Sequence, residues 1–165
     1  MLQVDSLSRA FGDLKAVDGV SFEVQDGEIF GLLGPNGAGK TTTLSMACGV
    51  LRPDAGRVLV DGHDIFLEPH VVKRSLGVVP QEIAVYEDLT AADNLSFWGS
   101  LYGLRGAERR RRVAEVVSRV GLSDRVRDRV ATYSGGMKRR LNLAMGLLHH
   151  PRLLLLDEPT VGIDP

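Results

Sequence analysis

A glycine-rich stretch carries the clearest chemical signal in the sequence. It reads Gly34, Pro35, Asn36, Gly37, Ala38, Gly39, Lys40 and Thr41, which fits the pattern G-x-x-x-x-G-K-[ST]. Glycines let the backbone turn so that several N–H groups face one anion, and a helix that begins there adds its positive dipole end. Lys40 can place a positive charge on the β- and γ-phosphates, and the Thr41 hydroxyl is a hard oxygen that suits Mg²⁺. The alternative is a glycine-rich turn between a strand and a helix that binds nothing.

Two acidic residues follow a short apolar run near the end of the sequence. Residues 153–156 are four leucines, and Asp157 and Glu158 come directly after them. A buried strand that ends in an aspartate can deliver a carboxylate to a Mg²⁺ beside the phosphates. The adjacent Glu158 can polarise an attacking water as a general base. The alternative is two solvated acidic residues at a strand end. The presence of the glycine-rich loop in the same sequence favours the phosphate site.

Strands and one helix are expected to position this loop. Val20, Phe22 and Val24 alternate with polar residues, which predicts a half-buried strand. The continuous apolar run 29–33 predicts a strand buried on both faces, directly before the loop. A helix is expected over 40–50, and short strands over 57–60, 76–79 and 153–156.

A helical block is expected between residue 90 and residue 150. Thr90 is a plausible N-cap, with Asp93 three residues on. A second helix begins near residue 107 and a third after Gly136. Valines at 113, 116, 117 and 120 give the second helix one apolar face. The whole order predicts an α/β core that carries a helical insertion.

Composition excludes several classes of protein. The 165 residues carry a formal net charge of −1 and a pI near 6.4, which argues against a dedicated nucleic-acid binder. The four arginines at 109–112 are expected to form a solvated face. A single cysteine, Cys48, cannot form an internal disulfide, so a reducing compartment is expected. We expect neither a secretory signal nor a membrane span, because no apolar run approaches the ~20 residues that a spanning helix needs.

Through the glycine-rich loop, the acidic strand end and further segments, the sequence resembles the ATP-binding cassette (ABC) transporter ATPases along essentially its whole length. Residues 133–138 resemble the family signature LSGGQ and precede an expected helix. In the family, this segment binds the γ-phosphate of an ATP held by the opposite subunit. An ordinary helix start with Ser134 as N-cap is the alternative for this segment alone.

Three further positions fit the resemblance. Gln81 follows an expected strand and looks like the glutamine that touches the Mg²⁺ shell and senses the transporter partner. Asp164 lies in a segment similar to the D-loop, whose aspartate crosses the dimer interface. Phe11 stands where the family places an aromatic ring that stacks on adenine. Residues 89–95 resemble the start of the helical subdomain in cassettes of drug-exporter type.

The resemblance implies a fold, a set of ligands and a set of partners. The fold is an α/β P-loop NTPase core with an N-terminal antiparallel β-subdomain and an inserted α-helical subdomain. Its expected boundaries are 1–85 for the core with the β-subdomain, 86–150 for the helical signature subdomain, and 151–165 for the Walker B strand and D-loop.

The expected cofactors are ATP and Mg²⁺. The residues assigned to ATP are Phe11, Gly34, Pro35, Asn36, Gly37, Ala38, Gly39, Lys40, Thr41, Thr42, Ser134, Gly135, Gly136 and Asp164. Thr41, Gln81 and Asp157 are assigned to Mg²⁺, and Glu158, Lys40 and Gln81 to catalysis. The expected partners are a second copy, paired head to tail, and a separate transmembrane permease at the cytoplasmic face of the membrane, with no nucleic acid.

The sequence also departs from the family pattern. Tyr133 replaces leucine and Met137 replaces glutamine in the signature, and Phe11 replaces the commoner tyrosine. The sequence stops before the strand that carries the family's switch histidine, so we expect a piece of a longer protein. Hydrolysis is therefore expected of that longer protein rather than of this chain alone. The alternatives are a soluble ABC-type ATPase that acts on ribosomes or DNA, and a nucleotide-binding fragment without turnover.

Overall fold

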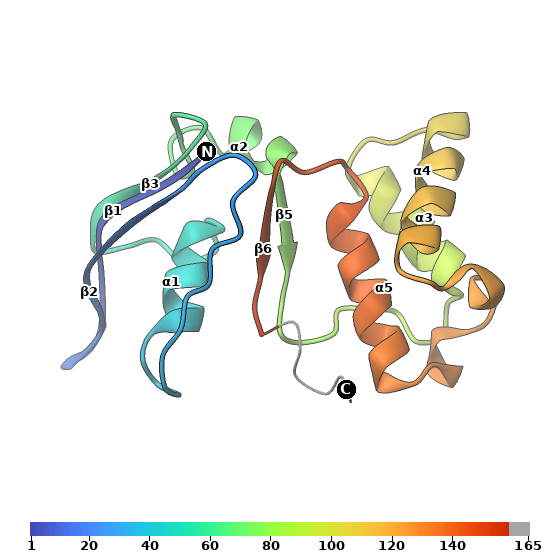
Figure 1. Ribbon diagram of the computed structural model, residues 1–165, viewed down its shortest axis with the longest axis horizontal. Coiled ribbons are helices and arrows are strands. Elements are labelled where there is room, and N and C mark those ends of the chain that lie inside the picture. The colour runs from blue at the N-terminus through green and yellow to red at the C-terminus, as the bar shows by residue number, and fades with distance from the viewer. Residues whose placement is uncertain (159–165) are drawn as a thin grey trace. The chain divides into compact units, whose positions relative to one another are not determined.

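The computed structural model describes residues 1–158 and divides the chain into two compact units, Met1–Leu76 and Gly77–Pro165 (Figure 1). The strands are β1 (Leu2–Phe11), β2 (Leu14–Val24), β3 (Ala55–Val60), β4 (His63–Asp64), β5 (Leu76–Val79) and β6 (Leu153–Leu156). The α-helices are α1 (Lys40–Ala47), α2 (Pro69–Ser75), α3 (Ala91–Leu101), α4 (Gly106–Arg119) and α5 (Gly135–Leu147). Two 3₁₀ turns, Ser123–Arg125 and Val130–Thr132, link α4 to α5. Within residues 1–158, no helix combines the length and the apolar composition that crossing a bilayer requires.

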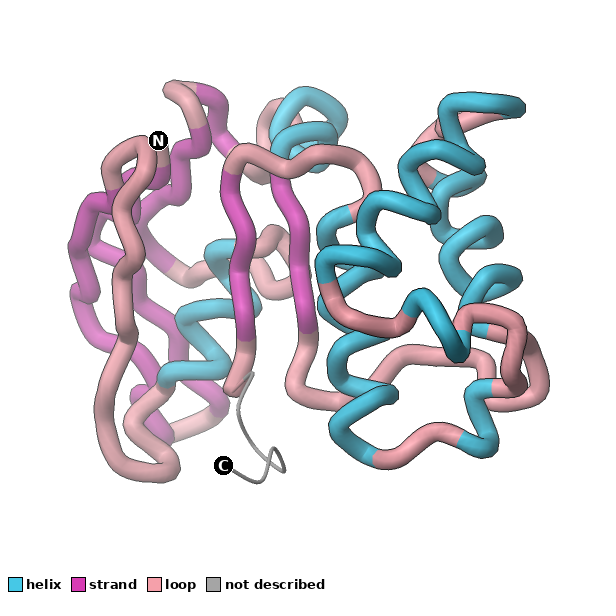
Figure 2. Tube along the Cα trace, turned by 45° about the vertical axis from the view of Figure 1, so that its right-hand side comes forward, coloured by secondary structure: helices cyan, strands magenta, loops and turns pink. Residues whose placement is uncertain are grey.

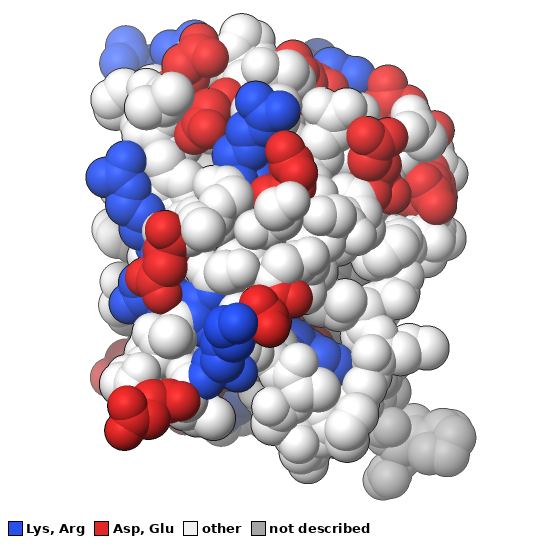
Figure 3. All heavy atoms as spheres, turned by 90° about the vertical axis from the view of Figure 1, so that its left-hand side faces the viewer, with Lys and Arg blue, Asp and Glu red and all other residues white. Residues whose placement is uncertain are grey.

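An antiparallel sheet in the order β2-β1-β3-β4 forms the first unit. Leu2 at the start of the central strand β1 pairs with Val24 on one side and with Val60 on the other. All three side chains are buried, and α1 packs against β1 and β2 with Met46 fully buried. The alternation predicted for 20–24 is confirmed in β2, where outward polar residues separate inward apolar ones. On the face viewed in Figure 3, basic and acidic side chains are interspersed.

The prediction of a strand over residues 29–33 is wrong. The whole run from the end of β2 to the start of α1 is loop (Figure 2), and Ile29 and Leu33 are 99% and 92% exposed. An apolar run becomes a strand only where a neighbouring strand satisfies its backbone groups. Among residues 1–158, no strand pairs with this run. The helix expected over 40–50 is also shorter, since α1 ends at Ala47.

Two adjacent strands and a helical block form the second unit. In Figure 1, β5 and β6 run side by side in the same direction, as neighbouring strands of one sheet. The Asp157 N–H donates to the Val79 carbonyl across this pair at 3.0 Å. The strands predicted over 76–79 and 153–156 are confirmed.

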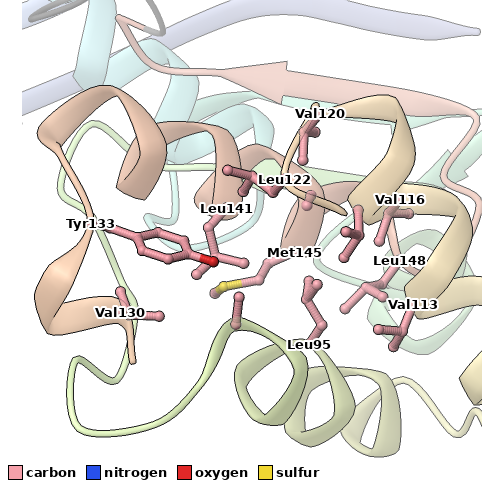
Figure 4. Close-up of a cluster of buried hydrophobic side chains, with 13 residues drawn as sticks. Leu95, Val113, Val116, Val120, Leu122, Val130, Tyr133, Leu141, Met145 and Leu148 are labelled. Atoms are coloured by element: carbon pink, nitrogen blue, oxygen red, sulfur yellow. The ribbon is translucent and has the colours of Figure 1, made fainter. Parts of the chain in front are cut away.

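The helical block has its own hydrophobic core (Figure 4). Its centre includes Leu95, Val113, Val116, Val120, Leu122, Val130, Tyr133, Leu141, Met145 and Leu148. The predicted apolar face of the second helix is therefore confirmed. The predicted cap of the first helix is confirmed too, because Thr90 Oγ1 accepts from the Asp93 N–H at 3.1 Å.

One arginine of the 109–112 run departs from the expected solvated face. Arg112 is only 3% exposed, and its Nε donates to the Leu148 carbonyl at 2.8 Å. A second nitrogen of the same guanidinium donates to the Leu147 carbonyl. Arg112 also pairs with Glu115 at 2.8 Å, and this contact holds the pKa of the Glu115 carboxyl below its usual value. The buried charge is tolerated because acceptors surround it.

Candidate functional site

The glycine-rich loop has a backbone that suits the enclosure of an anion. Gly37 and Gly39 both adopt a φ of 82°, a left-handed conformation that side chains disfavour. A Cβ on Gly39 would also lie 2.3 Å from the Ala16 carbonyl oxygen, so no larger residue fits there. The loop therefore passes close to β2, and glycine at this position is a steric requirement.

Lys40, the first residue of α1, lies across this loop. Its Nζ donates to the carbonyl oxygens of Gly34 and Pro35, each at 2.9 Å. The N-cap residue Gly39 makes no side-chain hydrogen bond to the helix, and the described first turn of α1 contains no acidic residue. The helix start thus keeps its positive dipole end and its N–H groups for a negatively charged ligand.

Phe11 lies at the same end of the sheet as this loop. It is the last residue of β1 and pairs with Leu14 across the β1–β2 hairpin. Gly39 packs on Ala16, two residues further along β2. Phe11 is 48% exposed, which is high for an apolar residue and leaves it accessible to a ligand.

In the second unit, the structure brings two of the predicted residues together. Gln81 Nε2 donates to Glu158 Oε2 at 2.9 Å, although the two residues are far apart in sequence. Gln81 follows β5 and Glu158 follows β6, so the paired ends of these strands explain the contact. Asp157 lies beside them and is bonded through its backbone to Val79.

The segment that resembles the family signature begins α5. Ser134 is the N-cap, and its Oγ accepts from the Met137 N–H at 3.2 Å. A Cβ added at Gly135 or Gly136 would meet no atom within 4 Å, so the outer side of this helix start is open. Tyr133, which replaces the family's leucine, is buried and donates its hydroxyl to the Arg125 carbonyl at 2.6 Å. Burial raises the pKa of this phenol.

Two residues of α5 that the motifs do not reveal hold the Gln81 loop in place. Asn142 is 4% exposed; its Nδ2 donates to the Pro80 carbonyl at 3.3 Å and its Oδ1 accepts from the Ala84 N–H at 3.4 Å. Arg139 Nη1 donates to the Gln81 carbonyl at 3.4 Å. A polar Asn142 beside the apolar stripe of a helix is the only sequence signal of this role.

The oxygen donors present suit Mg²⁺ better than a transition metal. Within residues 1–158, no three His, Cys, Asp or Glu side chains come together as a ligand cluster. Thr41, Gln81 and Asp157 offer a hydroxyl, an amide oxygen and a carboxylate, all hard ligands. Mg²⁺ is commonly held by one or two carboxylates together with substrate phosphates and water. Asp164, also assigned from sequence, lies outside the described residues.

Comparison with known proteins places the chain among related sequences. Residues 17–161 match the family model described as "ABC transporter". The linearmycin resistance ATP-binding protein LnrL of Bacillus subtilis (strain 168) is 52% identical over 165 residues, which are 100% of this chain and 53% of that protein. The daunorubicin resistance ATP-binding protein DrrA3 of Streptomyces coeruleorubidus is 44% identical, over 99% of this chain and 52% of its own length. The chain thus spans about half the length of these relatives.

A solved structure supports the same assignment. The cbiO1 protein of Clostridium perfringens, described as part of the ABC transporter complex cbiONQ, superimposes with a TM-score of 0.88 at 30% identity. The match covers 99% of this chain and 67% of that one. The predicted fold, with its antiparallel β-subdomain and inserted helical subdomain, is confirmed.

Proposed function

The chain belongs to the ABC transporter family, and on that premise we propose that it is the ATP-binding and ATP-hydrolysing part of a transporter that drives a separate transmembrane permease. The proposal rests mainly on the geometry of the phosphate loop. Lys40 lies across this loop, and the start of α1 has no side-chain cap. A loop of this geometry binds the phosphates of a nucleotide.

The first unit binds the nucleotide. The N–H groups of the loop and of Thr41 and Thr42 surround the phosphates, and Lys40 exchanges its two carbonyl acceptors for phosphate oxygens. This exchange is favourable because a hydrogen bond between two charged groups is stronger than one to a neutral carbonyl. Phe11 stacks on the adenine, as its exposed ring allows.

The second unit supplies the hydrolytic groups. Glu158 accepts a proton from the attacking water, and Gln81 orients that carboxylate through the 2.9 Å hydrogen bond. Gln81 and Asp157 of this unit, and Thr41 of the first unit, are the residues we assign to Mg²⁺, which would neutralise charge on the phosphates.

A second copy of the chain and a permease complete the proposed assembly. Ser134, Gly135 and Gly136 of one copy face the γ-phosphate bound by the other, because the start of α5 is open and carries a positive dipole end. Asp164 is assigned to the same interface. The relatives are named as resistance proteins, so we infer that the protein acts at the cytoplasmic face of the membrane in drug export.

Release of phosphate from ATP·Mg²⁺ tests the catalytic part of this proposal. We expect Glu158→Gln to lower the rate by about 100-fold or more, because it removes the general base. The matched control is Glu108→Gln on the exposed side of α4, which should leave the rate unchanged. Equal rates for Glu158→Gln and the unsubstituted chain would contradict the assigned role. Bound ATP with no release in any variant would favour a nucleotide-binding module without turnover.

A further inference from the structure

We propose that Arg9 and Asp54 are positioning residues that fix the Phe11 ring as a platform for a purine base. Arg9 occupies one face of the ring, and the base stacks on the opposite face. This inference rests on the proposed function, in which Phe11 receives adenine, and it adds the residues that prepare the ring for that contact.

The contact between Arg9 and Phe11 follows from their positions in β1. Side chains two residues apart along a strand point to the same side of the sheet. The Arg9 Cζ accordingly lies 5.1 Å from the centroid of the Phe11 ring. This separation is within the range of a cation–π interaction, in which the positive guanidinium is attracted to the negative face of the ring.

Asp54 fixes the guanidinium over the ring. Its Oδ1 pairs with Arg9 Nη1 at 2.6 Å, and its Oδ2 accepts from the Ala10 N–H at 2.8 Å. The carboxylate therefore bridges the side chain of Arg9 and the backbone between Arg9 and Phe11. Arg9 Nη1 also donates to the Arg52 carbonyl at 3.3 Å, so the side chain has little freedom to leave the ring.

This arrangement connects the ring to the phosphate loop within the first unit. Arg9 pairs with Val17 of β2, against which Gly39 of the loop packs. Asp54 lies in the segment that follows α1, and its N–H donates to the Ser8 carbonyl at 2.9 Å. The segment after the phosphate-loop helix is thus bonded to the strand that carries Phe11, and the residue before the helix packs against the neighbouring strand β2.

A cation on one face of Phe11 changes what the other face prefers. The face of an unperturbed aromatic ring is negative, which opposes direct stacking on another electron-rich ring. The Arg9 charge draws electron density toward itself, so the opposite face becomes less negative. This polarisation strengthens the stacking of Phe11 on a purine. Stacking matters more here because Phe11 has no hydroxyl that could add a hydrogen bond. The polarised ring should therefore affect the binding of the base but not the binding of the phosphates.

Two ligands, one with a base and one without, distinguish an effect on base binding from an effect on phosphate binding. We would measure the affinity of the 165-residue chain for ATP and for inorganic tripolyphosphate, both with Mg²⁺, by titration calorimetry. Arg9→Met should weaken ATP binding about two- to five-fold and leave tripolyphosphate binding unchanged. Arg9→Lys should recover part of the loss because it keeps the charge. The matched control is Arg57→Met, which removes an ion pair with Asp5 from the same sheet and should change neither affinity.

The outcomes distinguish this inference from the function on which it rests. Equal weakening of both ligands by Arg9→Met would show a general effect on the fold and would overturn the proposal, as would no weakening at all. Phe11→Ala provides the reference, since loss of base stacking should weaken ATP about five-fold or more. If Phe11→Ala is silent, or the unsubstituted chain does not bind ATP, the nucleotide assignment itself fails. If Arg9→Met does not fold, Asp54→Asn must show the same difference between the two ligands.

Discussion

The buried Arg112 links two helices of the second unit. Its guanidinium reaches from α4 to the carbonyls of Leu147 and Leu148 at the end of α5. Helix ends leave carbonyls without intrahelical partners, and a cation at that end also interacts favourably with the dipole. Arg112 therefore acts as a C-terminal cap supplied by another helix.

Exchanging Arg112 for methionine tests this role. Arg112→Met should lower the free energy of unfolding by about 2–3 kcal/mol, because buried carbonyls lose a charged donor. The adjacent Arg111 is exposed, and Arg111→Met should change the same quantity by no more than about 0.5 kcal/mol. Urea denaturation of both variants provides the measurement, and equal losses would refute the capping role.

Local hydrogen bonds could be predicted from sequence, whereas long-range ones could not. The Thr90 and Ser134 caps depend on residues three positions away, so a short motif contains all the information. Arg112, Asn142 and Arg9 depend on partners from distant segments. For Arg112 the residue type indicated a solvated face, because isolated polar side chains are usually exposed.

At the scale of elements, β5 and α5 approach each other closely through two glycines. A Cβ on Gly77 would lie 2.5 Å from the Gly146 carbonyl oxygen and 2.9 Å from a methyl group of Leu154. Real Cβ atoms do not approach other atoms this closely. A larger residue at Gly77 would therefore force β5 or α5 to move. Backbone contact of this kind places α5, and with it Asn142, directly against the sheet.

Gly77→Ala is expected to destabilise the chain despite the better strand propensity of alanine. Glycine in a strand costs roughly 0.5–1 kcal/mol relative to alanine, but overpacking costs about 1–3 kcal/mol. The net loss should appear as a lower urea midpoint. Gly135→Ala has open space around the new methyl group and should be neutral or stabilising. A Gly77→Ala variant as stable as the parent would contradict the close approach.

The apolar runs show why some strands could be predicted and another could not. Residues 153–156 and 29–33 have the same apolar character, yet only the first forms a strand. β6 has β5 beside it, whereas no strand among residues 1–158 pairs with 29–33. Hydrophobicity indicates a preference for burial, but hydrogen-bond partners decide whether a strand forms, and a single sequence does not name them.

At the scale of the whole molecule, the exposed run 29–33 predicts self-association. Ile29 and Leu33 are almost fully exposed, and Phe30 and Leu32 are partly so. A contiguous apolar surface promotes aggregation. The double variant Ile29→Ser and Leu33→Ser should reduce light scattering at high concentration without lowering the melting temperature.

A matched double variant controls for the loss of two exposed apolar residues. Val50 and Leu67 are also exposed but lie in separate segments. Val50→Ser with Leu67→Ser should therefore reduce scattering less. Equal reduction by the two double variants would mean that the run 29–33 has no special part in association.

A thermal-shift titration shows whether ATP·Mg²⁺ binds to the phosphate loop. A ligand that binds only the folded chain raises the melting temperature, since saturation at 100 times Kd adds about 2.7 kcal/mol. We expect a rise that Lys40→Ala abolishes and that Lys73→Ala, an exposed lysine of α2, preserves. No rise with ATP·Mg²⁺, or an equal rise in Lys40→Ala, would mean that the loop does not bind the nucleotide as proposed.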